Sequence, residues 1–372
     1  MRKIPDMTAS QRGRSRGMSL VELLVASAIG IIASLAIFQV FAVFEGQKRT
    51  TTAGGEAQTG GTLALYTIER DLRQGGYGFN TPDLVGCAMQ GWDQLTSTAI
   101  GPLTLVPVSI TQGAGSTLGV AGAPDTITVA YGNADALPAP VSILVSSLGV
   151  SDDFIKTVNA LYGFQPGDLV VIAEPGMPCT LAQVSQIPPA TGDNTKLNLQ
   201  AGNYINPYTG ATLPTRYNNP AGLGTAYTIN GKVYDIGPAP TIKVFSVQNA
   251  QLVSQALGVA AATPLFDNIV QLQAQYGKDL NNDGTVDAFD ETTPASTAEW
   301  AAVLALRIAV VSRSSLYEKD PVSPATIRLW DDSAASPTTT GPVWTLTADE
   351  RHYRYKVFHT VIPLRNMLWR PY

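Results

Sequence analysis

Oxygen-bearing side chains recur at fixed intervals in residues 279–290, the segment DLNNDGTVDAFD. Counted from its first aspartate, they stand at positions 1, 3, 5, 9 and 12, with glycine at position 6, which is the spacing of an EF-type calcium loop. In such a loop position 7 supplies a backbone carbonyl, and the glycine permits a sharp turn. The sequence therefore predicts a structural calcium site with these ligands: Asp279, Asn281, Asp283, Thr285, Asp287 and Asp290.

The last position of this loop differs from the usual one, because Asp290 stands where a bidentate glutamate is common. We therefore expect weaker or monodentate ligation there. A strand-like pattern precedes the loop and Pro294 follows it, so flanking EF-hand helices are not expected. The alternative is an Asx-rich hairpin whose carboxylates face solvent.

The two cysteines of the chain, Cys87 and Cys179, do not form a CxxC pair of the kind that binds zinc or does redox chemistry. In an oxidising compartment a disulfide between them is expected. The alternative is two buried free thiols, which behave as small hydrophobic groups.

The rest of the chain offers no catalytic constellation. Neither histidine, His352 or His359, has an adjacent nucleophile, no HExxH or GxSxG motif occurs, and the glycine-rich residues 113–119 lack the spacing of a phosphate loop. The net charge is -5, and no single-sign patch large enough for nucleic acid follows from the distribution of charges. The sequence therefore predicts a protein that is not an enzyme and has no nucleic-acid partner.

One carboxylate stands alone in the longest apolar segment, which runs from Met18 to Phe44. This segment exceeds the about 20 residues that cross a bilayer as a helix. Basic residues at positions 2, 3, 12, 14 and 16 precede it, which predicts a cytoplasmic N-terminus and a domain on the other side of the membrane. The carboxylate, Glu22, costs roughly 2.5 kcal/mol or more in a span, so we expect it to have a function.

Three interpretations of this segment compete. A cleaved secretory signal has a shorter apolar run, although residues 26–28 have a small-x-small pattern. An ordinary signal anchor leaves Glu22 unexplained. The third is a resemblance: a basic leader ending in Gly17, followed by Met18-Ser-Leu-Val-Glu22 and an apolar helix, resembles the class III signal of type IV prepilins.

The prepilin resemblance implies that prepilin peptidase cuts between Gly17 and Met18 and that the new N-terminal amine is methylated. Glu22 then becomes the fifth residue of the mature chain, which is where the family has its characteristic glutamate. A cleaved chain has an α-amino group in apolar surroundings, and the carboxylate of a neighbouring subunit can pair with it and set axial register.

Further segments resemble the PilW family of minor pilins. They are residues 69–77 (ERDLRQGGY), Gly86-Cys87, the Gly167-Asp168 strand leading to Cys179, the acidic loop at 279 and residues 358–366, which end in Pro-Leu-Arg-Asn. The resemblance implies a minor pilin that joins other minor and major pilins to prime or cap a type IV pilus, with roles in adhesion and motility. It also implies that the chain is held first in the inner membrane, with a periplasmic C-terminal domain, and is later at the cell surface.

Two other functions stay open. A type II secretion pseudopilin shares the signal, the helix and sometimes a calcium site. A membrane-anchored adhesin or carbohydrate-binding module would carry its specificity in residues 187–225, which are rich in Asn, Pro, Gly and Thr and which we expect to be an excursion from the core.

The expected fold class is α+β. A basic leader, residues 1–17, precedes a pilin helix over residues 18–75, whose part 18–44 is transmembrane and whose second half is amphipathic. Residues 76–372 are expected to form a mainly antiparallel β domain with long loops. Gly54-Gly55 and Gly60-Gly61 predict a kink or a break in the helix, and Gly75-Gly76 predicts its end.

Alternating or continuous apolar patterns predict strands at residues 125–131, 167–173, 242–244, 270–276 and 303–313, and a helical turn beginning near Thr297. In residues 270–276 apolar residues alternate with glutamines. We therefore expect one core face and one polar face.

Overall fold

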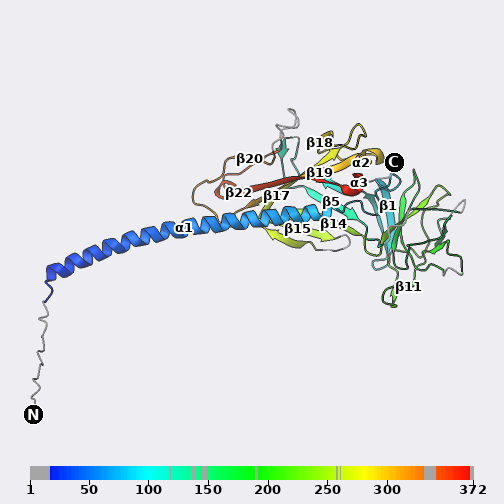
Figure 1. Cartoon of the computed structure of the whole chain (residues 1–372), viewed down its shortest axis with the longest axis horizontal. Coiled ribbons are helices and arrows are strands. Elements are labelled where there is room, and N and C mark those ends of the chain that lie inside the picture. Colours follow the sequence, from blue (N-terminus) through cyan, green and yellow to red (C-terminus); the bar gives the residue numbers. More distant parts are fainter. Residues whose placement is uncertain are drawn as a thin grey trace, which may run out of the picture. The chain divides into compact units, whose positions relative to one another are not determined.

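The computed structural model describes residues 17–117, 119–135, 140–144, 149–188, 192–256, 259, 261–330 and 341–368. The chain forms two compact units, Met1–Ala53 and Gly54–Tyr372. The predicted leader lies outside the described residues except for Gly17. The fold is α+β, as predicted: a long N-terminal helix precedes a mostly antiparallel β domain (Figure 1).

Helix α1 runs without interruption over Leu20–Leu72. In the first unit it exposes large apolar side chains all round, and Ile32 and Phe38 are 67% and 71% exposed. Its few polar groups are satisfied within the helix: Ser27 Oγ donates to the Leu24 carbonyl at 2.9 Å, and Ser34 Oγ to that of Gly30 at 2.8 Å. Residues 23–44 suit hydrocarbon or other apolar helices, because they carry no charged side chain and their backbone hydrogen bonds lie within the helix.

The predicted break at the paired glycines is wrong, because α1 continues through all four of them. In the second unit, a Cβ on Gly61 would collide with the ring of Phe358 and lie 2.9 Å from Ser312 Oγ. Ser312 Oγ in turn donates to the Ala57 carbonyl at 2.7 Å. The glycine at position 61 therefore allows the helix to approach a sheet closely, and this packing offsets its conformational cost.

Helix α1 ends at Leu72, shortly before the predicted end at Gly75-Gly76. The next backbone bonds are tighter than those of the helix, with Gly75 N donating to the Leu72 carbonyl at 3.0 Å. Gly76 then adopts a φ of 80°, which a residue with a side chain rarely adopts.

A four-stranded sheet, which we call the C-terminal sheet, has the order β18-β17-β19-β22. Its strands are β17 Ile269–Lys278, β18 Ala288–Asp290, β19 Val303–Arg313 and β22 Tyr355–Pro363. This confirms the predicted strands at 270–276 and 303–313. The predicted helical turn is α2, Thr297–Ala301, which starts where Ser296 Oγ accepts the Glu299 N–H at 3.2 Å.

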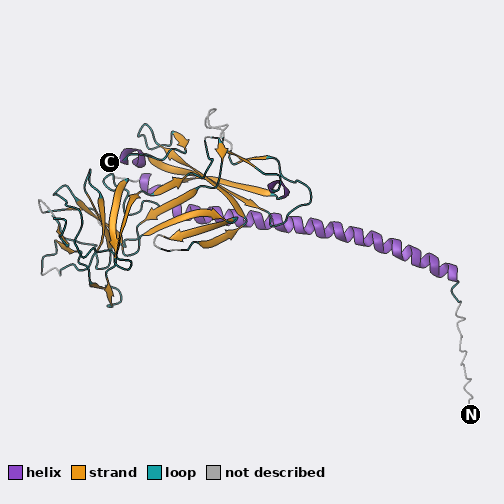
Figure 2. Ribbon diagram, turned by 180° about the vertical axis from the view of Figure 1, so that it is seen from behind, coloured by secondary structure: helices purple, strands orange, loops and turns teal. Residues whose placement is uncertain are grey.

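A five-stranded sheet of order β16-β15-β14-β5-β3 contains the predicted strands at 125–131 and 242–244. Its bounds are β3 Val108–Thr111, β5 Thr126–Tyr131, β14 Thr241–Gln248, β15 Gln251–Ala256 and β16 Thr263–Asp267. One core joins this sheet, the C-terminal sheet and α1, through residues such as Ile68, Ile127 and Ile308. Figures 1 and 2 both show the end of α1 beside these two sheets.

A six-stranded sheet, which we call the disulfide sheet, has the order β2-β1-β9-β8-β13-β6. Its strands are β1 Cys87–Asp93, β2 Thr98–Leu105, β6 Val141–Ser142, β8 Leu169–Ala173, β9 Cys179–Gln183 and β13 Lys232–Gly237. All five residues of β8 are buried, as its continuous apolar run predicts. Strands β1 and β9 are parallel, and the other pairs of this sheet are antiparallel.

Smaller sheets complete the domain. They are β20 Thr326–Arg328 with β21 Val343–Thr345 and β4 Val120–Ala121, β7 Phe154–Lys156 with β10 Lys196–Asn198, and β11 Asn203–Ile205 with β12 Thr212–Pro214. Two short helices, η1 Glu350–His352 and α3 Arg365–Leu368, lie on either side of β22 in the chain.

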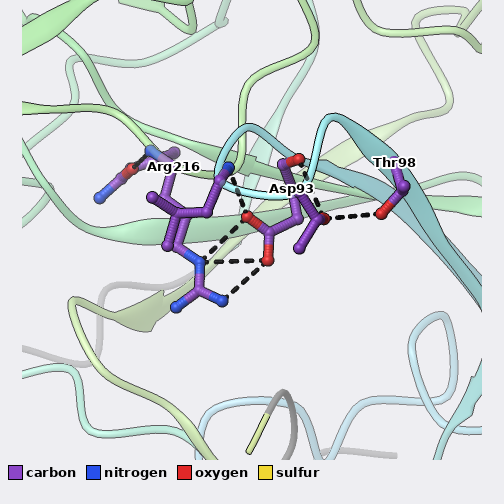
Figure 3. Close-up of polar contacts among 6 residues, drawn as sticks. Asp93, Thr98 and Arg216 are labelled. Atoms are coloured by element: carbon purple, nitrogen blue, oxygen red, sulfur yellow. Dashed lines mark hydrogen bonds and ion pairs between the residues drawn. The ribbon is translucent and has the colours of Figure 1, made fainter.

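Residues 187–225 are not merely an excursion, because Leu197, Leu199 and Leu223 are buried in a core with β8 and β9. An ion pair also connects this segment to the disulfide sheet, between Arg216 and Asp93 of β1. Arg216 Nη2 donates to Asp93 Oδ2 at 2.8 Å, and Arg216 Nε lies 3.2 Å from both carboxylate oxygens (Figure 3). This guanidinium lowers the pKa of Asp93. The expectation of an excursion rested on the polar composition of residues 187–225, and composition does not show which individual leucines are buried in a core.

The glutamine face of β17 is polar, as predicted, and it is also buried: Gln271 and Gln273 are each 1% exposed. Gln271 Nε2 donates to the Gly122 carbonyl and Gln273 Nε2 to the Ala123 carbonyl, both at 2.9 Å. A loop before β5 therefore covers this face and satisfies its amides.

Candidate assembly site

The predicted processing bond lies outside any helix. Gly17 and Met18 are exposed and extended ahead of α1, and Met18 is 66% exposed. Ser19 Oγ accepts the Glu22 N–H at 3.2 Å, which caps the helix start. A protease can therefore reach the Gly17–Met18 bond without unwinding α1.

Glu22 lies in the first turn of α1, where the helix dipole favours a negative charge. Its side chain is exposed among apolar neighbours. By length and composition α1 could cross a membrane: its apolar window has a mean hydropathy of 2.4, and none of that window is buried in the structure. Glu22 therefore stands at one end of an apolar surface that the chain itself does not cover.

A buried ion pair fixes the second half of α1. Asp71 is 2% exposed, and its Oδ2 accepts from Lys243 Nζ on β14 at 2.6 Å. Arg70 Nε lies farther away, 3.4 Å from the other carboxylate oxygen. The sequence signal for this contact was a charged residue within an otherwise core-facing helix pattern, and its partner lies in a distant strand.

The Pro-Leu-Arg-Asn segment closes the end of α1. Leu364 is 1% exposed and belongs to the core. Asn366 Nδ2 donates to the carbonyls of Gln74 and Gly75, each at 3.1 Å, and Asn80 Nδ2 donates to the Asn366 carbonyl at 2.7 Å. The side chain of Asn366 thus satisfies carbonyls of the turn that follows α1.

A disulfide joins Cys87 and Cys179, as predicted, with their Cα atoms 6.0 Å apart. The two cysteines begin the parallel strands β1 and β9, and Cys179 is opposite Met89 in the register. The bond therefore reinforces the parallel pair of the disulfide sheet.

The acidic loop folds around the carboxylate of Asp279, which is 3% exposed. This carboxylate accepts from Asp283 N at 3.2 Å and from Gly284 N at 2.9 Å. Asn281 Nδ2 bridges to Asp283 at 3.1 Å and to Asp287 at 3.3 Å. Bonds from Thr285 lower the pKa of Asp283. The loop thus gathers five of the six predicted ligands.

The sixth, Asp290, lies on β18, and its Oδ1 accepts from Lys278 Nζ at 2.7 Å and from Thr292 N at 2.8 Å. Within the described residues, no three acidic, histidine or cysteine side chains already converge as a metal cluster. Ligation by Asp290 would therefore require it to leave Lys278.

Two family models match the chain. Residues 12–38 match the prokaryotic N-terminal methylation motif, and residues 227–366 match the type IV pilus-assembly protein W. Together the two matches support a PilW-family type IV pilin. Comparison with curated proteins and with solved structures gave no match.

The matched residues of this PilW-family pilin coincide with the features above. The N-terminal match includes Gly17 and Glu22, and the C-terminal match includes the acidic loop, the C-terminal sheet and Asn366. The apolar helix and the methylation motif are those of a membrane-anchored pilin. Both partners of the disulfide lie outside the matched ranges.

Proposed function

We propose that this chain is a minor pilin that acts without catalysis in the priming or tip complex of a type IV pilus. The observation that carries the proposal is the exposed Gly17–Met18 bond ahead of an apolar, uncovered helix inside a methylation-motif match. Prepilin peptidase would cut this bond in the inner membrane, with the β domain in the periplasm, and methylation of Met18 would follow.

Glu22 would then act in assembly. Cleavage leaves a charged amine at Met18, and the carboxylate of a neighbouring subunit offsets it in surroundings where neither charge is solvated. Helix bundling with other minor and major pilins would bury the apolar surface of residues 18–44. The pairing would select one axial register among several that are equally apolar.

Variants of the full chain in its own host test this function. Gly17→Ala should abolish cleavage, which mass measurement of the membrane-bound chain detects. Glu22→Ala should be cleaved normally but lower the number of pili, while Glu45→Ala, which removes another exposed carboxylate of α1, should leave piliation unchanged. Cleavage of Gly17→Ala before Met18 would refute the prepilin assignment. Lost protein secretion with unchanged piliation would assign the chain to type II secretion.

We also propose that the acidic loop binds calcium as a structural ion. Support comes from hydrogen bonds within one loop: Asn281 Nδ2 donates to the carboxylates of Asp283 and Asp287, and the carboxylate of Asp279 accepts from the backbone N–H groups of Asp283 and Gly284. Gly284 has a φ of 84°, as the sharp turn of a calcium loop requires. The carbonyl of Thr285 would be a further ligand, as position 7 requires. The ion would neutralise carboxylates that otherwise repel one another.

Calorimetric titration of the full chain in detergent tests the calcium site, with magnesium as the control ion. We expect heat on addition of calcium and a higher unfolding temperature, and both effects should vanish in Asp283→Ala. Asp290→Asn should weaken binding less, because Asp290 is paired with Lys278. No heat and no change in unfolding temperature at millimolar calcium would exclude the site.

A further inference from the structure

Strand β22 forms an edge of the C-terminal sheet and hydrogen-bonds only to β19 in its sheet. It has nine residues, more than any other edge strand in the described part of the chain. Its register with β19 runs from Tyr355 to Pro363 without a bulge. Long, regular edges are templates for another strand, and proteins usually interrupt or cover them.

The direction of the backbone groups of β22 follows from the bonds at its two ends. Ser314 N donates to the Arg354 carbonyl at 2.7 Å, and Leu364 N donates to the Leu304 carbonyl at 2.8 Å. In an antiparallel pair, residues alternate between facing the partner strand and facing away. Even-numbered residues of β22 therefore face β19.

The odd-numbered residues Val357, His359 and Val361 consequently point their N–H and carbonyl groups away from the sheet. Their amide groups have no hydrogen-bond partner among the described residues. His359 and Val361 are exposed, and Val361 is 45% exposed.

On the opposite side of the same sheet, the part of β17 that is not paired with β18 is closed. Leu272 N donates to Gln271 Oε1 at 3.0 Å, and Ala274 N donates to Asp125 Oδ2 at 2.8 Å. The Leu272 carbonyl accepts from Asp125 N at 2.8 Å. Side chains thus occupy the outward backbone groups of β17, and nothing comparable occupies those of β22 in the described structure.

We propose that the open edge of β22 receives an extended strand from a different pilin subunit, which forms backbone bonds to residues 357, 359 and 361. The proposal rests on the proposed function and names a contact within it. Main-chain bonds would supply affinity, and side chains beside the edge would supply selectivity.

The charge of the edge excludes a second copy as the preferred partner. Lys356 and His359 are exposed, and β22 contains no acidic residue. Pairing β22 with itself would join two strands that carry Lys356 and no carboxylate, so neither strand could neutralise the other, and like charges on facing strands are destabilising. The strand that fits carries carboxylates near Lys356 and His359 and an apolar side chain near Val361.

Hydrogen exchange resolved to single amides tests the proposal. The probes are the other pilin subunits of the same host, each purified in detergent and added separately to the full chain. The subunit that binds should slow exchange at amides 357, 359 and 361 by about tenfold or more, whereas amides 358 and 360 are already protected by β19.

Two variants at one position separate backbone from side-chain recognition. His359→Pro removes an outward N–H without removing a bond to β19, a place where edge strands tolerate proline. His359→Thr keeps the N–H. We expect His359→Pro to weaken binding of that subunit about tenfold or more, or about 1.4 kcal/mol, and His359→Thr to stay near the wild type. The unfolding temperature of each variant shows whether it folds.

Each remaining result overturns the proposal. Equal binding by the two variants would exclude backbone pairing, and protection at these amides by raising the concentration of the chain alone would indicate a second copy. Binding of a subunit with protection elsewhere would exclude the edge and leave the pilin function standing. If no subunit binds and Gly17→Ala is still processed, the pilin function fails as well.

Discussion

The C-terminal sheet and the disulfide sheet hold their parts together by different means. The first receives residues 54–72 of α1 through a glycine contact, and two neighbouring elements add to this packing: a buried Lys243–Asp71 pair from the five-stranded sheet and the amide of Asn366 from α3. The second relies on the Cys87–Cys179 bond and on more exposed ion pairs, such as Lys232 with Asp83. We therefore expect the stability of the C-terminal sheet to depend on the fit of the helix, and that of the disulfide sheet to depend more on its disulfide.

The largest difference should follow loss of the disulfide. Replacing both Cys87 and Cys179 with Ser should lower the free energy of unfolding by about 4 kcal/mol, because the bond spans 92 residues and constrains the unfolded chain. Urea unfolding of the full chain in detergent measures this, and dithiothreitol should destabilise the wild type but not the variant. An unchanged midpoint would show that the disulfide sheet does not depend on oxidation.

Lys243→Met should cost about 3 kcal/mol, because it leaves the buried Asp71 carboxylate without its main cation. The matched variant in the disulfide sheet, Lys232→Met, should cost less than about 1 kcal/mol, since its side chain is 42% exposed. If Lys243→Met and Lys232→Met lost similar free energies of unfolding, the buried ion pair would not distinguish the packing of α1 from the disulfide sheet. Adding Asp71→Leu to Lys243→Met should recover stability.

Gly61→Leu should cost about 2 kcal/mol, because the new side chain collides with Phe358 and Ser312. Gly54→Ala is the control, since nothing lies within 4 Å of its Cβ position, and it should raise helix stability by about 0.5–1 kcal/mol. Thermal unfolding distinguishes them. A tolerated Gly61→Leu would mean that the helix does not need close approach.

A buried carboxyl group in the disulfide sheet, that of Asp235, should make the free energy of unfolding fall by about 1 kcal/mol per pH unit between its unfolded and folded pKa values. Burial, and then the nearby Asp168, raise the pKa of Asp235 to about 7, above an unfolded value of about 3.9. The folded state therefore holds this proton more tightly, and the stability it contributes is complete below about pH 4 and is lost as pH rises to about 7.

Asp235→Asn keeps an oxygen for the Gly237 N–H and removes this charge. Its unfolding free energy should vary less between pH 5 and pH 7 than that of the wild type, and it should exceed the wild type at pH 8. Parallel pH curves for the two proteins would rule out Asp235 as the source.

Local patterns predicted much of both sheets. The largely apolar pattern of residues 303–313 predicted the full length of β19. The five consecutive apolar residues after Asp168 predicted β8. The disulfide partners followed from there being only two cysteines. Loop spacing placed five of the six predicted ligands in one hydrogen-bonded loop, but no three acidic side chains converge within the described residues, and calcium binding stays a prediction.

Contacts between distant segments were not predictable in this way. Gly61 was interpreted as a helix breaker because its cost is local, whereas the ring of Phe358 that requires it lies on β22. The glutamines of β17 were expected on a polar face, and their burial depends on carbonyls about 150 positions earlier. Such partners are set by the fold and leave no periodic signal.

The side-chain amide of Asn366 donates to the carbonyls of Gln74 and Gly75, which directly follow helix α1. This donor exists only once synthesis has passed residue 366. The C-terminal end of α1 therefore stays without its final contacts while the rest of the domain is made, and a chain cut short before residue 366 cannot form them. The final contacts at the end of α1 therefore depend on a residue 292 positions after Gln74.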